Sequence, residues 1–181
     1  MSILDKVVAA VSPTPTEAMR QEARARARIT AGNHGWLMAA IRHHQQIEAA
    51  FAAVSSAQES RARIFAQRRL GVLLTGHANA EEAVLYPALR QAGEKTSAAR
   101  AFEEQAEAKS LMADLERLAP MSREYLELLE QLRVAVTHHM YEEEGTWFLD
   151  LAETLTEDDD VKLTQRYNEE FDRYVGGLAL S

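Results

Sequence analysis

Long stretches of this chain contain no glycine or proline and repeat apolar residues at intervals of three and four. Only 8 Gly and 4 Pro interrupt the 181 residues, and few runs alternate as strands do. Apolar residues three and four apart lie on one face of a helix. The pattern therefore predicts an all-α chain whose helices pack through these faces.

Residues that cap or break helices set the predicted boundaries. Four hydroxyl residues precede periodic stretches and are the expected N-caps: Thr16, Ser60, Ser122 and Thr156. Four long helices are expected, at about residues 34–54, 61–90, 98–118 and 123–155. Pro87 is expected to end or bend the second of them. Short connections between long helices predict an antiparallel up-down four-helix bundle, with short extra helices at the N- and C-termini.

We divide the chain accordingly into three segments. These are a leader and pre-helix at 1–30, a central bundle at 31–155, and a C-terminal helix and tail at 156–181. The N-terminal MSILDKVVAAV lacks the basic region and long apolar core of a signal peptide. A cytoplasmic location is the expectation. The leader and the terminal helix are the segments available for pairing with a second copy as a homodimer.

Charge and cysteine content exclude several classes of function. The net charge of -8 at pH 7 argues against a nucleic-acid partner and against docking on an anionic membrane. No stretch is long and uncharged enough to span a bilayer. With 0 Cys, the chain has no disulfide, Cys-ligated zinc or iron–sulfur cluster. Any metal site must be built from nitrogen and oxygen ligands.

Histidine and glutamate recur at a spacing of four residues, which places them on the same helical face. Of the 6 histidines, these four have a glutamate at +4: His44–Glu48, His77–Glu81, His138–Glu142 and His139–Glu143. His138 and His139 are neighbours, so only one of them can face the interior. An excess of such pairs indicates a shared function rather than a solvated edge.

The motif is part of an internal repeat. HANAEEAVLYPAL at 77–89 matches HMYEEEGTWFLDL at 139–151, with His, Glu at +4, Glu at +5 and an aromatic at +9. The offset is 139 − 77 = 62 residues, and a shift of 61 carries His44 onto Gln105. Two copies of a helix pair would bring His44, His77 and His139 from three helices toward one axis. Imidazoles and carboxylates converging inside a bundle suit iron, manganese or zinc.

A lone histidine on the first bundle helix, followed by H-x-x-x-E on the second and fourth, resembles the hemerythrin-like (HHE cation-binding) family. LYP after the second motif and WF after the fourth strengthen the resemblance, which covers about residues 30–155. It implies a four-helix bundle with a non-heme di-iron centre, two ions per chain, and manganese or zinc as alternatives. By position it assigns as metal ligands His44, His77, Glu81, His139 and Glu143. Glu81 and Glu143 would be the bridging carboxylates.

The chain departs from this pattern at Gln105, where the third helix of the family supplies a histidine. An amide oxygen ligates weakly or bonds a water, so one half-site is either open or weakened. Glu48 is included as a sixth ligand, the alternative being an ion pair with Lys109, its repeat counterpart. The aromatics after the motifs are expected in the core or rim: Tyr86, Trp147 and Phe148. Supporting or solvent-facing positions are expected for the rest: His34, His43, Glu82, His138 and Glu144.

Three functions remain open. The first is an iron protein that binds or senses a small ligand such as O2, NO or peroxide. The second is a di-iron enzyme that reduces peroxide or NO at a metal position left open by Gln105. No histidine has Glu at −3, so the E-x-x-H pattern is missing, which argues against a ferritin-like oxidase. The third is a structural or partner-binding bundle with a degenerate metal site.

Overall fold

The computed structural model describes residues 14–176, and these residues form helices joined by short connections. The α-helices are α1 (Glu17–Thr30), α2 (Gly35–Ser56), α3 (Ser60–Ala80), α4 (Tyr86–Gln91), α5 (Lys95–Leu115), α6 (Arg123–Glu142), α7 (Phe148–Thr154) and α8 (Glu157–Val175). A short 3-10 helix, Ala31–Asn33, precedes α2, and two π-helical turns are η3 (Glu81–Leu85) and η4 (Glu143–Trp147). The predicted all-α class is confirmed for this part of the chain. Residues 1–13 of the predicted leader segment and residues 177–181 of the predicted tail lie outside it.

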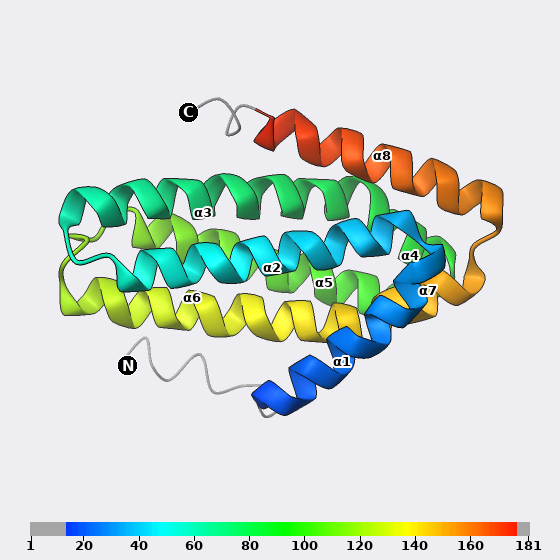
Figure 1. Cartoon of the computed structure of the whole chain (residues 1–181), viewed down its shortest axis with the longest axis horizontal. Helices are drawn as coiled ribbons and strands as arrows, with labels where there is room; N and C mark the ends of the chain where they lie inside the picture. The colour runs from blue at the N-terminus through cyan, green and yellow to red at the C-terminus, as the bar shows by residue number, and fades with distance from the viewer. Residues whose placement is uncertain (1–13, 177–181) are drawn as a thin grey trace.

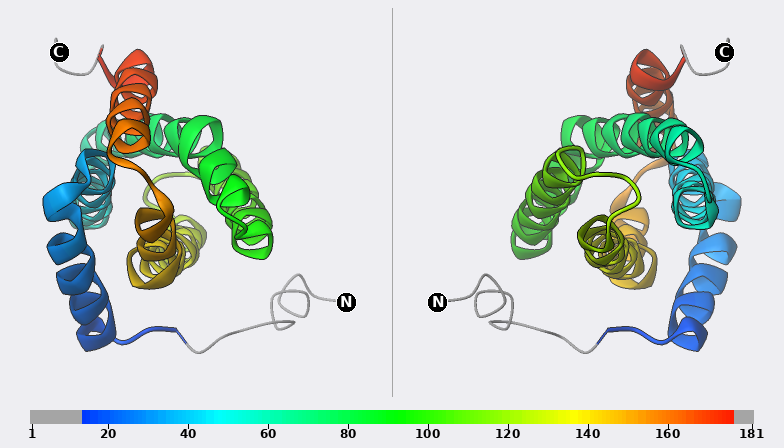
Figure 2. Two further views of the ribbon diagram at one scale, coloured as in Figure 1. Left: turned by 90° about the vertical axis from the view of Figure 1, so that its right-hand side faces the viewer. Right: turned by 90° about the vertical axis from the view of Figure 1, so that its left-hand side faces the viewer.

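Four long helices, α2, α3, α5 and α6, lie side by side along the long axis and surround a common interior (Figures 1 and 2). Two further helices cover this group from outside. Helix α8 packs on α2 and α3, and α1 packs on α2 and η4. Helix α1 has 14 residues and α8 has 19, so both are longer than the predicted short extensions. No helix of the described residues is long and apolar enough to cross a membrane.

Three of the four predicted N-caps are confirmed. Thr16, Ser122 and Thr156 have extended backbones, and each side-chain oxygen accepts a hydrogen bond from the N–H three residues later. The prediction at Ser60 is wrong, because Ser60 is the first residue of α3 and Glu59 precedes it without a side-chain cap. These caps begin helices α1, α6 and α8 at their observed positions.

A π-helical turn begins at the first glutamate of each repeated motif. Turn η3 starts at Glu81 and η4 starts at Glu143. Pro87 does not end its helix, which continues to Gln91. The second turn has Leu149 at the position equivalent to Pro87, so the proline does not produce the turns. Turns of this kind occur frequently at functional sites.

Two apolar clusters fill the interior, and a polar layer separates them. Along α2, Trp36 to Ile41 contribute to the first cluster and Ile47 to Val54 to the second. Between these segments lie the buried imidazoles of His43 and His44. The polar layer is therefore shielded by apolar side chains on both sides along the bundle axis.

Candidate metal centre

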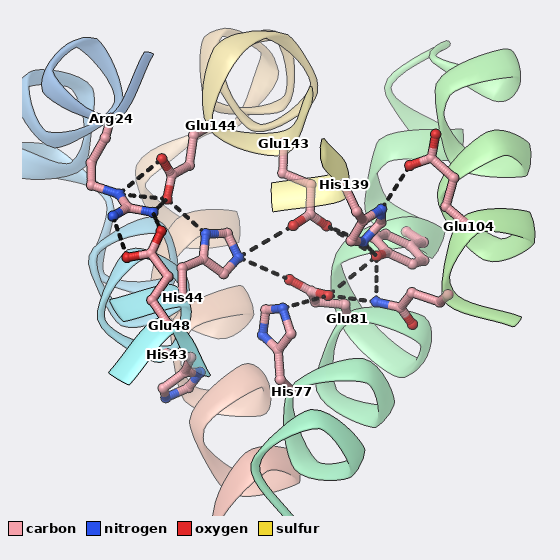
Figure 3. Close-up of polar contacts among 12 residues, drawn as sticks. Arg24, His43, His44, Glu48, His77, Glu81, Glu104, His139, Glu143 and Glu144 are labelled. Atoms are coloured by element: carbon pink, nitrogen blue, oxygen red, sulfur yellow. Dashed lines mark hydrogen bonds and ion pairs between the residues drawn. The ribbon is translucent and has the colours of Figure 1, made fainter. Parts of the chain in front are cut away.

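Five predicted ligands meet in the polar layer (Figure 3). They come from five helical elements and are all buried: His44 on α2, His77 on α3, Glu81 at the start of η3, His139 on α6 and Glu143 at the start of η4. Their spacing of four along α3 and α6 turns each histidine and its glutamate toward the same interior point. The structure thus brings together the residues of both repeated motifs.

Four of these residues surround a space of the size of one cation. One ligand atom from each of His44, His77, Glu81 and Glu143 lies within 4.8 Å of all the others. Four atoms of these residues are buried and make no hydrogen bond: Nε2 of His44, Nε2 of His77, Oε1 of Glu81 and Oε2 of Glu143. Their polar contacts are ion pairs within the cluster, such as Nε2 of His44 with Oε2 of Glu143 at 3.2 Å. Buried polar atoms are nearly always partnered. Four potential ligand atoms around one point fit a bound cation, and a set of nitrogen and oxygen ligands suits iron, manganese or zinc.

The other predicted ligands, His139 and Gln105, face the hydroxyl of Tyr86. The Tyr86 oxygen lies 2.9 Å from Nε2 of His139, 3.0 Å from Oε1 of Glu143 and 3.2 Å from Oε2 of Glu81. The amide nitrogen of Gln105 donates to the same hydroxyl at 2.5 Å and to Oε2 of Glu81 at 2.6 Å. Tyr86 was expected among the core or rim aromatics, and it is buried within the polar site itself.

A carboxylate and an arginine orient His44 from the side of the imidazole that faces away from the cluster. Nδ1–H of His44 donates to Glu144 at 2.8 Å, which leaves Nε2 facing the cluster. Arg24 on α1 donates to Glu144 at 3.0 Å and to both oxygens of Glu48 at 2.8 and 2.9 Å. Glu48, the predicted sixth ligand, therefore lies outside the four-atom cluster and is paired with Arg24 (Figure 3). Helix α1 thus contributes to the position of a candidate ligand.

The alternative pairing of Glu48 is also not formed. Lys109, its predicted partner, donates to Glu82 at 2.6 Å. This ion pair is partly exposed, consistent with a supporting or solvent-facing position for Glu82. In the repeat, Glu82 corresponds to Glu144, which is bound to Arg24. The two halves of the site therefore have different carboxylate partners.

His139 has an arrangement like that of His44. Its Nδ1–H donates to Glu104 at 2.9 Å, and Arg100 donates to Glu104 at 2.8 Å. Neither Glu104 nor Arg100 belongs to a repeated motif, so no sequence pattern predicted their role. A carboxylate behind each of these imidazoles fixes its tautomer and directs Nε2 inward.

Helix α8 reaches the site through Tyr167. Its hydroxyl lies 3.5 Å from Nδ1 of His77 and 3.1 Å from Nδ1 of His43. His43 also stacks on Phe171, with ring centroids 3.5 Å apart. Burial, followed by the charge of His44, lowers the pKa of His43 to about 3. His43 is thus a neutral, buried support for α8 rather than a candidate ligand.

Burial and neighbouring charges shift the pKa values of the central groups in different directions. Burial, with the charge of His44, lowers the pKa of His77 well below its usual value. Burial also disfavours the charged form of His44, but hydrogen-bonded carboxylates outweigh it and raise this pKa. Burial and then Glu143 raise the pKa of Glu81 to about 7. Burial opposes ionisation of Glu143, yet His139 and His44 hold its pKa low. An ionised carboxylate beside a neutral imidazole is the state that binds a cation.

Comparison with known families identifies the architecture. The family model for the hemerythrin HHE cation binding domain matches residues 40–174. The chain belongs to this family. The resemblance found from the repeated motifs is confirmed, and the match includes α8 as well as the four long helices. Domains of the HHE family bind metal cations, and this one carries the His/Glu cluster described above.

A curated relative with sequence similarity is named DNA nickase and comes from Nostoc sp. (strain PCC 7120). It is 34% identical over 83 residues, which cover 46% of this chain and 24% of the relative. The chain therefore aligns with about a quarter of that protein. No solved structure gives a significant match.

A cavity of about 250 Å³ opens beside the HHE site, between α3, α5 and α6. Most of its lining is apolar, and three lining side chains belong to the polar layer: His77, Gln105 and His139. The Oε1 atom of Gln105 is buried and has no hydrogen-bond partner. The cavity thus reaches the edge of the polar layer at these three side chains.

Proposed function

We propose that this HHE domain is an iron protein that binds or senses a small ligand such as O2, NO or peroxide. The observation that carries the proposal is the group of four unpartnered nitrogen and oxygen atoms in a buried layer. Iron held there would supply a redox-active centre with affinity for such ligands. A degenerate structural site is disfavoured, because apolar side chains would fill such a layer at lower cost than unpartnered polar atoms.

The residues of the site have separate tasks in this function. His44 and His77 would hold the ion through Nε2, and Glu81 and Glu143 through the unpartnered oxygens. Glu144 keeps the proton of His44 on Nδ1, away from the ion. The surrounding apolar clusters exclude water and so strengthen these interactions.

The cavity beside the site supports a small, uncharged ligand. Its mainly apolar lining suits a small uncharged molecule rather than a nucleotide or a sugar, and its volume of about 250 Å³ is ample for such a molecule. Gln105 and His77 line it, so a ligand in the cavity would lie next to the proposed ion.

Metal content tests the proposal. Protein purified anaerobically from iron-supplied cells should contain iron, and NO should change the absorption spectrum of the reduced protein. His77→Ala should abolish iron binding. His138→Ala is the matched control, because His138 also has a glutamate at +4 but is partly exposed outside the cluster. Wild-type protein that stays metal-free despite iron supply, or equal losses in both variants, would refute the proposal.

Peroxide reduction is a second candidate, favoured by the unpartnered Oε1 of Gln105 beside the cavity. This acceptor suits a ligand that carries O–H, which hydrogen peroxide has and O2 and NO lack. Reduction of one peroxide to two waters uses two electrons and two protons, so the assay supplies ascorbate. Consumption that is lost in Glu81→Ala and weakened in Gln105→Leu would establish an enzyme. If the protein consumes peroxide no faster than free iron does, the enzyme hypothesis is refuted and only the ligand-binding proposal stands.

DNA cleavage is not part of the proposal. The name DNA nickase belongs to a relative of which 24% is aligned here. The net charge of -8 also opposes binding to a phosphate backbone.

A further inference from the structure

The internal repeat allows the two halves of the site to be compared atom by atom. The paired positions are His77 and His139, Glu81 and Glu143, His44 and Gln105, and Tyr86 and Phe148. In the first half, both imidazoles and one oxygen of each glutamate are unpartnered. In the second half, one polar atom from each of four residues lies within hydrogen-bond distance of the Tyr86 hydroxyl. These residues are His139, Gln105, Glu81 and Glu143.

The Tyr86 oxygen stands at the centre of the second half-site. Its four polar neighbours lie at 2.5 to 3.2 Å, which are hydrogen-bond lengths. A metal ion would need the same nitrogen and oxygen atoms at about 2.0 to 2.2 Å. The hydroxyl and an ion therefore compete for one position. The ring is buried and packs edge-on against Phe102, with centroids 5.1 Å apart, so its place is fixed by packing.

Gln105 presents the wrong group for a second ion. Its amide nitrogen, a donor, points to Tyr86 and to Oε2 of Glu81 at 2.6 Å. An ionised carboxylate accepts only, so the nitrogen rather than the oxygen faces Glu81 in that form. The amide oxygen, the atom that was expected to ligate weakly, does not bond to any of these groups. An N–H donor directed at this position suits a hydroxyl oxygen and repels a cation.

The first half lacks such a hydroxyl. The repeat counterpart of Tyr86 is Phe148, which is buried and packs edge-on against Trp36 at 5.6 Å. A phenyl ring offers no polar atom to His44, so this half keeps its donors for an ion. The difference between the halves thus involves two positions together, Gln105 with Tyr86 on one side and His44 with Phe148 on the other.

We infer that this domain binds one metal ion, at His44, His77, Glu81 and Glu143, and that the Tyr86 hydroxyl replaces the second ion of a paired site. The inference rests on the proposed metal-binding function. Tyr86, Gln105 and His139 then act as positioning groups that hold the outer oxygens of the two glutamates. This departs from the two ions per chain that the family resemblance implied.

Metal stoichiometry tests the inference on the full chain. Titration of the metal-free protein with Co²⁺, followed by absorbance, should end at one equivalent, and purified protein should contain one iron per chain by elemental analysis. The double variant Tyr86→Phe/Gln105→His removes the hydroxyl and restores the imidazole, and it should take up a second equivalent. Two tight equivalents in wild type would overturn the inference. No binding at all would instead refute the proposed function on which it rests.

A spectroscopic measurement covers the case in which the double variant fails to fold. A phenol that is only hydrogen-bonded gives no phenolate-to-iron absorption band. We therefore expect the ferric wild type and ferric Tyr86→Phe to have the same visible spectrum. The single variant keeps the ring and should also bind one ion. A visible band abolished by Tyr86→Phe would show that Tyr86 ligates iron and would overturn the inference.

Discussion

The carboxylate behind His44 gives the most discriminating test of how the site is organised. Glu144 is buried, with a side chain 2% exposed, and accepts from Nδ1–H of His44 at 2.8 Å. Replacing it by glutamine keeps the size but removes the charge that holds the imidazole in its metal-binding tautomer. Hydrogen bonds to charged groups contribute about 1.5 to 3 kcal/mol. Loss of an outer partner of a ligating histidine typically weakens metal binding about 10- to 100-fold, or about 1.4 to 2.7 kcal/mol. We expect a loss in this range for Glu144→Gln.

Glu104→Gln is the matched control. It makes the same chemical change behind His139, where Nδ1–H donates to Glu104 at 2.9 Å. If a single ion is held by His44 and not by His139, this variant should lose less than about threefold in affinity, or about 0.65 kcal/mol. The ratio between the two variants therefore reports which imidazole binds the ion.

Affinity is measured by competition for Co²⁺ or Zn²⁺ with a chelating dye, at fixed pH and after unfolding curves show that both variants are as stable as wild type. Similar losses in Glu144→Gln and Glu104→Gln would mean that both imidazoles bind metal. An unchanged affinity in Glu144→Gln would mean that His44 is not a ligand. Either result would refute the assignment.

Four further predictions concern access, stability and pH. Gly71→Val should slow NO binding in stopped-flow without changing iron content, because a Cβ at Gly71 lies 3.1 Å from the Met112 methyl and both residues line the cavity. Asp160→Ala should lower the free energy of unfolding in urea by about 1 to 3 kcal/mol, since Oδ1 accepts from the Trp36 indole at 2.8 Å and ties α8 to α2. Removing metal with a chelator should lower the melting temperature, with a loss of about 4 kcal/mol where free metal had been 1,000 times its Kd. The pKa of His43 is about 3 in the fold, below its unfolded value of about 6.5, so the unfolded chain binds more protons between these values. Metal-free wild type should therefore lose about 1.4 kcal/mol per pH unit below pH 6.5 relative to His43→Gln, as measured by urea unfolding at several pH values.

Sequence periodicity was sufficient to predict the helices and to choose the residues that meet. A spacing of four fixes His77 with Glu81, and His139 with Glu143, on one helical face whatever the rest of the chain does. The repeat then placed His44 opposite them. These are local or symmetric relations, and they depend only on helix geometry. The ligand roles of these residues remain predictions that metal analysis will test.

The supporting contacts could not be predicted, because they join distant parts of the chain. Arg24 and Glu144 are 120 positions apart, and Tyr167 and His77 are 90 apart. They depend on how α1 and α8 pack outside the four long helices, and no repeated motif marks them. The same packing pairs Glu48 with Arg24, which binds both of its oxygens.

Tyr86 is buried in the core as predicted, but the contact of its hydroxyl with the polar site was not predicted, for a local reason. In a regular α-helix each residue advances by 100°, so a side chain five positions after Glu81 points about 140° away from it. The π-helical turn η3 has wider i to i+5 geometry, which brings residue i+5 back toward the same face. Tyr86 and Glu81 therefore meet at 3.2 Å although their spacing predicts separation. The substitution at Gln105 alone was ambiguous between an open and a weakened half-site. Together with the tyrosine it fits the inference of a single ion, because the Gln105 amide donates to the Tyr86 hydroxyl at 2.5 Å.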